Sequence, residues 1–547
     1  MNNKRLTLFV LLVAAAVVDV LACTNLIVGK NASTDGSTIV SYSADSYGLF
    51  GELYHYPAGM HKKGTLIDVH EWDTGRYLGQ IEQARQTYNV IGNMNEFQLT
   101  IGETTFGGRP ELVDTTGIID YGSLIYLGLQ RSRTAREAIK IMTELVQEYG
   151  YYSSGESFTI ADPNEVWIME MIGKGPGVRG AVWVAVRVPD DCISAHANQS
   201  RIRQFDMNDK NNCMYSPDVI SFAREKGYFD GVNKDFSFAD AYAPLDFSAL
   251  RYCEARVWSY FNRFTDRGNE FLPYITGEST TPMPLFVKPS RKISVQDVKD
   301  AMRDHYEGTP LDISKDFGAG PYHTPYRLSP LSFKVGDREY FNERPISTQQ
   351  TGFVFVAQMR STLPDPIGGV LWFGTDDANM TVFTPVYCCT DKIPVCYSRV
   401  DGADYITFSW NSSFWIFNWI ANMVYPRYDL MIGDVRDAQS ELESTFNDAQ
   451  EGVEAAAAKL LEKDPAKARA FLTNYTNLTA QSTLDTWKRL GEFLIVKYND
   501  GVVKRMKDGK FERDAIGQPA GVIRPGYPKE FLEEYVKQTG DRYKIPE

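Results

Sequence analysis

Short runs of apolar and β-branched residues, separated by turn formers, dominate the first 200 residues and predict β-strands. Turns such as Asp162-Pro163-Asn164-Glu165 join neighbouring runs into pairs. The predicted strands are residues 25–29, 37–42, 87–93, 98–103, 157–161, 165–170, 181–188 and 192–197. This spacing is typical of antiparallel sheets.

One helical segment interrupts these strands. Apolar residues recur three and four positions apart between residues 122 and 149, which predicts an amphipathic helix; they include Leu124, Leu127, Ala135, Ala138, Ile139, Met142 and Val146. Paired strands with interspersed helices indicate the α+β class.

The second half of the chain changes character twice. Residues 265–350 are rich in Pro, Gly and charge, which predicts extended loops that shape or cover a site, and strands resume at 351–359, 368–373 and 380–387. Residues 414–424 are aromatic and apolar, as core segments are, and 433–463 and 465–498 are strongly helical. We therefore expect a main domain over residues 23–430. A helical region over 431–547 would pack on the core or help subunits associate into a homo-oligomer.

Composition is that of a large globular protein. The chain has 547 residues, 43% of them hydrophobic and 13% aromatic, enough to bury a sizeable core. Its formal net charge of -13 disfavours nucleic acid as a partner. After the first 22 residues, no long apolar run indicates a membrane span.

Residues 1–22 have the pattern of a signal peptide. Lys4 and Arg5 precede an apolar stretch over residues 6–18, and Leu21-Ala22 places a small residue before Cys23. Cleavage there predicts export to the periplasm or the exterior, with Cys23 as the first residue of the mature chain. Asp19 and Val20 make the cleavage site a fair match, and nearby alanines offer alternative sites.

Two fates of Cys23 compete. Residues 20–23 also resemble a lipobox, in which the sulfur is acylated and anchors a surface lipoprotein that need not be an enzyme. Residues 24–28, however, have strand character, 29–36 are dense in turn formers, and 37–42 read as the returning strand. A hairpin that starts at the cysteine favours a folded, catalytic position over a flexible tether.

An N-terminal cysteine carries its own base. The thiol has a pKa of about 8.5 and an α-amine about 7.7 to 8.0, so the amine can accept the thiol proton. The chain has six histidines, none in a recognisable catalytic or metal motif. No metal or organic cofactor is implied. The other six cysteines read as packed or incidentally bridged residues.

An ordered series of motifs supports this chemistry. Cys23-Thr24-Asn25-Leu26-Ile27-Val28-Gly29-Lys30 is followed by residues 35–37 and Asp45, and then by residues 92–96, 102–106, 134–139, 155–158, 170, 197–202, 256–258, 358–360 and 385–387. The series resembles the dipeptidase family of N-terminal-nucleophile (Ntn) cysteine hydrolases, related to penicillin V acylases and bile salt hydrolases. It covers roughly residues 23–430.

The resemblance implies a four-layer αββα sandwich and a set of catalytic residues. Asp45 would hold the α-amine, Asn198 would donate its amide to the oxyanion, and Arg256 would set the electrostatics of the thiol. Plainer interpretations stay open. Asp45 also fits an ordinary strand end, Asn198 a turn or glycosylation sequon, and Arg256 an arginine that snorkels beside Trp258.

The chain departs from the related acylases at Tyr42, where those enzymes have an arginine three residues before the aspartate. The substrate therefore does not follow from those acylases, and the resemblance to the dipeptidase family implies dipeptides or short peptides with a free amino terminus. Glu103 and Thr105 are the candidate contacts for that amine, although both also suit a continuing strand. An acylase of the penicillin or bile-salt type is the alternative enzyme.

Overall fold

The structure, a computed structural model, describes residues 23–547. The predicted signal peptide, residues 1–22, lies outside the described residues. Helices and strands are mixed along the chain, as the α+β prediction expects. No helix within residues 23–547 is long and apolar enough to cross a membrane.

The first sheet has six strands in the order β14-β1-β2-β18-β19-β20, and all neighbours are antiparallel. Their bounds are β1 (Asn25–Val28), β2 (Thr38–Asp45), β14 (Ile193–His196), β18 (Thr351–Met359), β19 (Gly369–Thr375) and β20 (Thr384–Tyr387). All residues of these strands are buried, because both faces of the sheet are covered. The predicted hairpin from residue 24 to residue 42 is confirmed, with Ile27 opposite Val40.

The second sheet has eight strands in the order β15-β13-β12-β11-β10-β9-β8-β3. Their bounds are β3 (His55–Tyr56), β8 (Val90–Ile91), β9 (Met94–Asn95), β10 (Thr100–Gly107), β11 (Gly155–Ala161), β12 (Val166–Gly173), β13 (Ala181–Arg187) and β15 (Cys213–Tyr215). The prediction of one strand over residues 87–93 was wrong. That stretch is divided between β7 (Gln86–Thr87) and β8, which belong to different sheets.

The predicted helix over residues 122–149 is two helices, α1 (Tyr121–Arg131) and α2 (Ala135–Tyr149). Ser132 is extended, and the Thr134 side chain accepts from the backbone N–H of Glu137, which starts a new helix. Apolar spacing continues across the break and hides it in the sequence. Both helices pack on the eight-stranded sheet.

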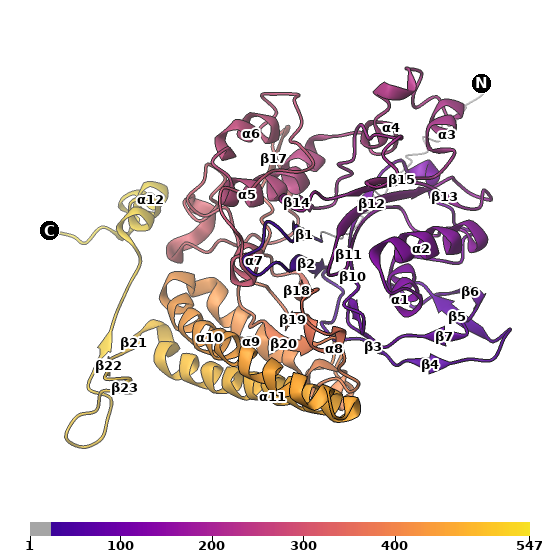
Figure 1. The fold of residues 1–547 in the computed structure, drawn as a ribbon. Coiled ribbons are helices and arrows are strands. Elements are labelled where there is room, and N and C mark those ends of the chain that lie inside the picture. Colours follow the sequence, from indigo (N-terminus) through magenta and orange to yellow (C-terminus); the bar gives the residue numbers. More distant parts are fainter. Residues whose placement is uncertain (1–22) are drawn as a thin grey trace, which may run out of the picture.

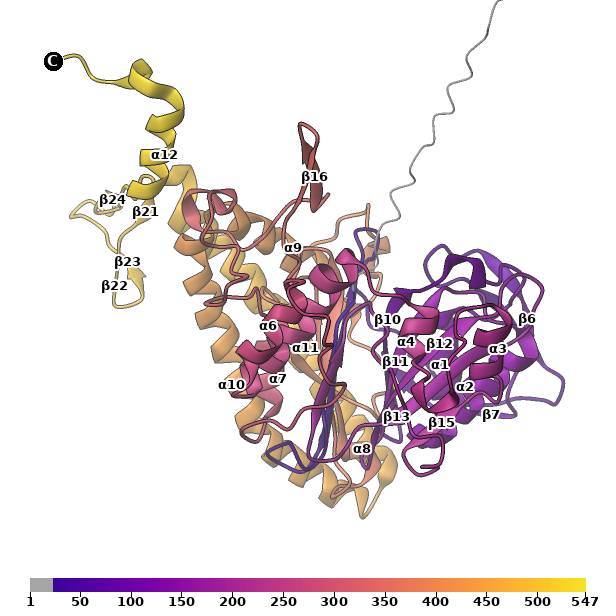
Figure 2. The same ribbon diagram turned by 90° about the horizontal axis from the view of Figure 1, so that it is seen from above.

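The two sheets pack face to face, and helices cover the free face of the six-stranded sheet. Figure 2 shows the six-stranded sheet edge-on between the eight-stranded sheet and α7 and α10. The covering helices are α5 (Ala255–Phe264), α7 (Val295–Met302), α9 (Ser413–Val424), α10 (Tyr428–Leu461) and α11 (Pro465–Tyr498). Hydrophobic residues between these layers form the main core.

Three elements confirm the predicted C-terminal helices and the aromatic core segment. α10 and α11 form an antiparallel pair, and Trp487 of α11 stacks on Phe417 of α9 with ring centroids 4.8 Å apart. α11 also packs on the edge strand β20. The two long helices are thus continuous with the main hydrophobic core.

The expectation that residues 265–350 are extended loops holds only in part. This segment contains α6 (Gly268–Ile275), α7 and a hairpin of β16 (Ser332–Val335) and β17 (Arg338–Phe341). A capping box at Ser294 and Asp297 starts α7, a local signal that the Pro and charge content masked.

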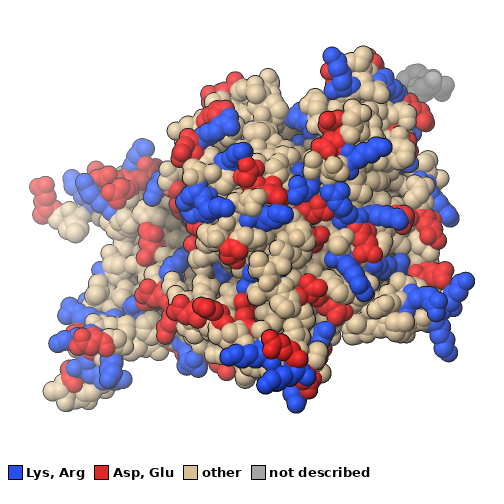
Figure 3. Space-filling model, viewed as in Figure 1, with Lys and Arg blue, Asp and Glu red and all other residues tan. Residues whose placement is uncertain are grey.

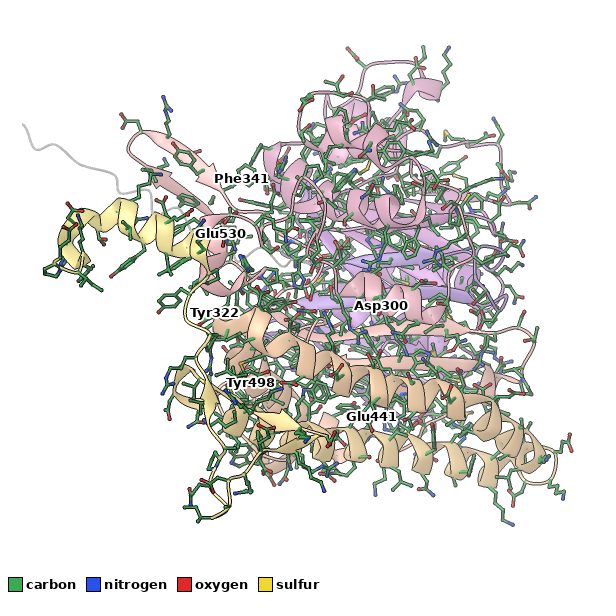
Figure 4. All side chains as sticks on the ribbon, turned by 90° about the vertical axis from the view of Figure 1, so that its left-hand side faces the viewer. Asp300, Tyr322, Phe341, Glu441, Tyr498 and Glu530 are labelled. Atoms are coloured by element: carbon green, nitrogen blue, oxygen red, sulfur yellow. The ribbon has the colours of Figure 1, made fainter. Side chains whose placement is uncertain are left out.

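The last 49 residues, 499–547, extend from the body (Figure 1) and none of them is buried. They form short strands and α12 (Lys529–Thr539), which meets the body where Phe531 stacks on Phe317. Figure 4 shows α12, marked by Glu530, near Tyr322. The remaining elements are β4 (Gly59–Met60), β5 (Leu66–His70), β6 (Tyr77–Glu82), α3 (Val219–Glu225), α4 (Phe238–Tyr242), α8 (Asp365–Gly368), β21 (Val503–Lys504), β22 (Met506–Lys507), β23 (Lys510–Phe511) and β24 (Val522–Ile523).

Candidate active site

Cys23 lies at the start of the central hairpin, between the two sheets. It is 4% exposed, and the backbone of the next residue, Thr24, pairs with Ser43 of β2. Its Sγ lies 3.8 Å from the hydroxyl of Tyr42 and also receives the backbone N–H of Asp45. The second strand of the hairpin, β2, therefore contacts the sulfur of Cys23.

The Cys23 thiol is buried, and two acidic residues lie near it. Burial raises the pKa of Cys23 well above its ordinary value, and the charges of Glu103 and Asp45 add to this, while the hydrogen bonds from the Asp45 N–H and Tyr42 act in the other direction. The sulfur is accordingly a thiol in this arrangement. It becomes a nucleophile only when a base removes its proton.

Asp45 ends β2, and three side chains hold its carboxylate. Arg344 donates to Oδ2 at 2.6 Å, Thr351 donates to Oδ1 at 2.7 Å, and Ser43 donates to Oδ2 at 3.1 Å. Arg344 comes from the predicted loop segment 265–350, and no sequence pattern marked it. Within residues 23–547, no hydrogen bond joins the Cys23 nitrogen to this carboxylate.

Arg256 joins Cys23 to Asn198. Its guanidinium donates to the Cys23 carbonyl at 2.6 Å, to Thr24 Oγ1 at 2.8 Å and to Asn198 Oδ1 at 2.9 Å. Arg256 is only 1% exposed, so the interpretation of a snorkelling arginine was wrong, because a snorkelling head group stays in water. Burial and the nearby Arg344 lower its pKa to about 10. It is the second residue of α5, which directly follows a π-helical turn over Ala249–Glu254.

Asn198 follows β14 with a left-handed backbone, φ 62°. Its amide nitrogen donates to the Thr105 carbonyl at 2.8 Å, which ties β14 to the eight-stranded sheet. This is possible because β10 pairs with β9 only at Thr100, so its later backbone groups on that side are open to other partners. The residue is buried, and both its amide nitrogen and its amide oxygen form hydrogen bonds.

Glu103 and Thr105 continue β10 as expected, and their side chains reach two different groups. The Tyr42 hydroxyl donates to Glu103 Oε1 at 2.6 Å, and Thr105 Oγ1 donates to Glu156 Oε1 at 2.8 Å. Asn25 donates to the Glu103 carbonyl at 2.6 Å. All six residues predicted from the sequence thus lie in one hydrogen-bonded network around Cys23.

Glu156 is a member of this network that sequence reasoning missed. Burial raises the pKa of Glu103 to about 7, against hydrogen bonds from Tyr42, Glu156 and Cys23 that lower it. Burial, together with the charge of Glu103, raises the pKa of Glu156 well above its ordinary value. The burial of both groups and the charge of each on the other therefore disfavour a state in which both are ionised. Residues 155–158 carried the resemblance, but a single sequence does not reveal that Glu156 faces Glu103.

His196 is the histidine nearest the hairpin in the sheet register, opposite Asn25. Thr104 and Thr159 contact its two ring nitrogens, each at 2.7 Å, and burial lowers its pKa to about 3. A ring with both nitrogens engaged is unsuited to act as a base. All seven cysteines are free and buried, so of the two alternatives for the other six, packed rather than bridged residues, the first is confirmed within residues 23–547.

A cavity of about 280 Å³ borders the two arginines of the site. Ser46 and Tyr47, which follow Asp45, form part of its wall, and the rest is lined mainly by residues 325–332 and 343–350 with Tyr252. The predicted role of the 265–350 segment in shaping a site is consistent with this lining.

Comparisons with known proteins agree with the motif series. The model of peptidase family C69 matches residues 22–55 and 51–441. A probable dipeptidase of Salmonella dublin is 31% identical over 388 residues, 67% of this chain and 81% of the relative. A probable dipeptidase of Latilactobacillus sakei is 25% identical over 478 residues, 83% of this chain and 91% of the relative. Dipeptidase A of Lactobacillus helveticus is 24% identical over 438 residues, 76% of this chain and 84% of the relative.

Proposed function

The chain belongs to peptidase family C69 and is a cysteine-type dipeptidase, and from this premise we propose that Cys23 is its nucleophile, exposed by removal of residues 1–22 during export. The observation that carries the proposal is the convergence of Asp45, Arg256 and Tyr42 on this one cysteine. Cys253 also contacts Arg256, but within residues 23–547 no contact joins it to Tyr42 or Asp45.

Because the pKa of the Cys23 thiol is raised, the reaction needs a base held close to the sulfur to remove the thiol proton. The α-amine of a mature Cys23 meets this need, directly or through a water, because it is part of the same residue. In the precursor the same nitrogen belongs to a peptide bond and cannot accept a proton. Export cleavage is then also activation.

The proposed reaction is acyl transfer through a thioester. The Cys23 sulfur attacks the scissile carbonyl while its amine takes the thiol proton, and Asn198 with a backbone N–H stabilises the oxyanion. The ammonium then donates to the leaving amine as the C–N bond breaks. Water, deprotonated by the free amine, cleaves the thioester and restores the thiol. Asp45 orients the amine and favours its protonated form, and Arg256 fixes the carbonyl of Cys23 and the amide of Asn198.

The substrates we propose are dipeptides or short peptides with a free amino terminus. Glu103 and Thr105 lie on the strand that faces the sulfur, and the acidic Glu103 suits a cationic amine better than an acyl chain. The cavity beside Arg256 is large enough for the leaving residue. An acylase of the penicillin or bile-salt type would instead prefer a blocked amine.

We further propose that the order of helices, sheet, sheet and helices is the Ntn-hydrolase four-layer sandwich, with β1 as its central strand. α10 and α11 extend this domain, and the C-terminal region from residue 431 is packed on it through β20 and α9. Lipid anchoring at Cys23 fits less well, since the sulfur is buried against Tyr42 rather than directed to a tether.

The mass and first residue of the exported protein test this proposal. We expect a chain that begins at Cys23 with an unmodified thiol, and loss of most dipeptide turnover in correctly processed Cys23→Ser protein. Unchanged turnover in processed Cys23→Ala protein would reject the nucleophile. A diacylglycerol thioether on Cys23 would reject the mechanism as well. Matched Cys192→Ala protein should keep full activity.

A further inference from the structure

The loop between β19 and β20, residues 376–383, is buried along its whole length. Loops normally lie at the surface, because their backbone polar groups need water, so a buried loop has to be held by specific hydrogen bonds. Two adjacent aspartates begin this loop, Asp376 and Asp377, which are 1% and 0% exposed. The proposed reaction uses neither of them.

The carboxylate of Asp377 accepts four hydrogen bonds, two on each oxygen. Tyr326 and Tyr425 donate their hydroxyl groups to Oδ2 at 2.5 and 3.0 Å. Ser347 and the backbone N–H of Asn379 donate to Oδ1 at 2.6 and 3.0 Å. All four donors are uncharged groups, and three of them come from outside the loop. Asp377 therefore holds separate segments of the chain together at one point.

Two of these donors belong to the cavity beside Arg256, in which the proposed function places the leaving residue. Tyr326 is 8% exposed and lies in the lining segment 325–332, and Ser347 lies in the lining segment 343–350. These two segments supply most of the lining. A single buried carboxylate is therefore hydrogen-bonded to both of them.

The side chain of Tyr326 is held from two further directions. The Asn379 amide donates to its hydroxyl at 2.7 Å, and its ring packs edge-on against His305 with centroids 4.8 Å apart. Burial, and then the charge of Asp377, raise the pKa of Tyr326, so the hydroxyl keeps its proton and donates it to the carboxylate. The position of this part of the cavity wall thus depends on Asp377.

The neighbouring Asp376 has different contacts. Its Oδ1 accepts from Asn418 at 2.9 Å, and its Oδ2 accepts from no donor among the described residues. Asp376 is not among the residues that line the cavity. Because it has the same side chain, the same burial and a place in the same loop, Asp376 is a matched control for Asp377.

We propose that Asp377 positions the wall of the leaving-residue cavity through Tyr326 and Ser347, and thereby determines how well the enzyme holds the residue that it releases. The inference rests on the proposed function and adds to it a positioning residue that touches no reacting atom. A carboxylate suits this role because both of its oxygens accept hydrogen bonds, whereas one end of an amide can only donate.

The test compares two substrates with the same acyl group. Alanyl-alanine places a residue in the cavity, whereas alanine methyl ester releases methanol and does not fill it. Whichever way the amide of Asp377→Asn turns, its nitrogen faces two donors, so kcat/KM for alanyl-alanine should fall about tenfold, mainly through a higher KM. The value for the ester should change by less than about twofold. Asp376→Asn should change neither.

Tyr326→Phe is a second variant, which keeps the ring and removes the hydroxyl. It should show the same selective loss, and Asp377→Asn should add little to it in the double variant, because both changes remove the same interaction. Circular dichroism melting identifies the folded variants. An equal loss for both substrates in folded protein would mean that Asp377 only stabilises the fold and would overturn the inference. Unchanged kinetics in Asp377→Asn, or additive losses in the double variant, would overturn it as well.

A binding measurement separates this inference from the assignment of the nucleophile. In calorimetry on processed Cys23→Ala protein, addition of Asp377→Asn should weaken the binding of alanyl-alanine about tenfold. Equal affinities with and without Asp377→Asn would overturn the inference even if Cys23 is the nucleophile. A tenfold difference would support the role of Asp377 even if another residue proved to be the nucleophile.

Discussion

The hydroxyl of Tyr42 lies 3.8 Å from the sulfur of Cys23 and donates at 2.6 Å to Glu103. One side chain thus contacts both the Cys23 sulfur and the Glu103 carboxyl group. Its ring is fixed by edge contacts with Phe353 and Phe355 of β18, so the hydroxyl has little freedom to move. The position at which the sequence departs from related acylases is therefore a position in direct contact with the thiol.

Replacing Tyr42 by Phe keeps the packed ring and removes the hydroxyl. Glu103 then loses a hydrogen-bond donor and the sulfur loses a neighbour that stabilises its anion, so we expect kcat/KM for dipeptides to fall about ten- to a hundredfold. Tyr260→Phe is the matched control, because its hydroxyl donates to the Ile27 carbonyl on the same hairpin, away from the sulfur. Similar rates in the two variants would contradict a role for Tyr42 in the reaction.

The sequence carried the local features of the fold and a set of candidate site residues, but not the contacts between distant segments. Period-two and helical patterns predicted most strands and helices, and the cysteine after the leader predicted the nucleophile. Arg344 and Glu156 were not found, because an arginine in a loop and a glutamate in a strand have no local mark. They reach the site only in the folded chain. There β18 brings residues 344–351 to Asp45, and the pairing of β10 with β11 brings Glu156 close to Glu103.

The buried pair of Glu103 and Glu156 predicts a particular pH dependence of stability. The folded-state pKa of Glu103, about 7, is above its unfolded value, so its contribution to stability is fully present below the unfolded pKa and is lost as pH rises through 7. Glu103→Gln removes this penalty. The melting temperature of the variant relative to wild type should therefore be higher at pH 8 than at pH 5. A relative melting temperature that is flat or falls over this range would contradict the raised pKa of Glu103.

Gly102 sits where the two sheets approach each other beside the nucleophile. A Cβ at this position would collide with Asn25 Oδ1 and come within 3.3 Å of Tyr42 Cβ. We expect Gly102→Ala to lower the free energy of unfolding by about 1 to 3 kcal/mol and to reduce turnover, because it displaces both neighbours of Cys23. Gly452→Ala on the exposed face of α10 meets no atom within 4 Å and should instead stabilise by up to about 1 kcal/mol. Urea unfolding and dipeptide turnover measure both effects.

Ion pairs of this protein lie both on its surface and in its interior, and the two kinds should contribute differently to stability. Figure 3 shows Lys and Arg interspersed with Asp and Glu over the viewed face. Exposed pairs of this kind, such as Lys140 with Glu144, contribute little to stability. The pair between Arg303 of α7 and Glu443 of α10 is different, since both side chains are buried. Figure 4 shows these helices side by side, marked by Asp300 and Glu441.

Glu443→Gln should lower the free energy of unfolding by about 3 to 5 kcal/mol, whereas Glu144→Gln should change it by less than about 0.5 kcal/mol. Glu443 accepts from Arg303 at 2.5 Å and from the Phe383 N–H at 3.0 Å, so the substitution leaves a buried guanidinium poorly compensated. Burial alone would raise the pKa of Glu443, but the charges of Arg303 and Lys299 lower it to about 2. Its stabilisation is therefore present above the unfolded pKa and is lost as pH falls towards 2. The difference between wild type and variant in the urea midpoint should shrink from pH 6 to pH 3. A variant as stable as wild type at pH 6 would mean that α10 is an appendage rather than part of the catalytic core.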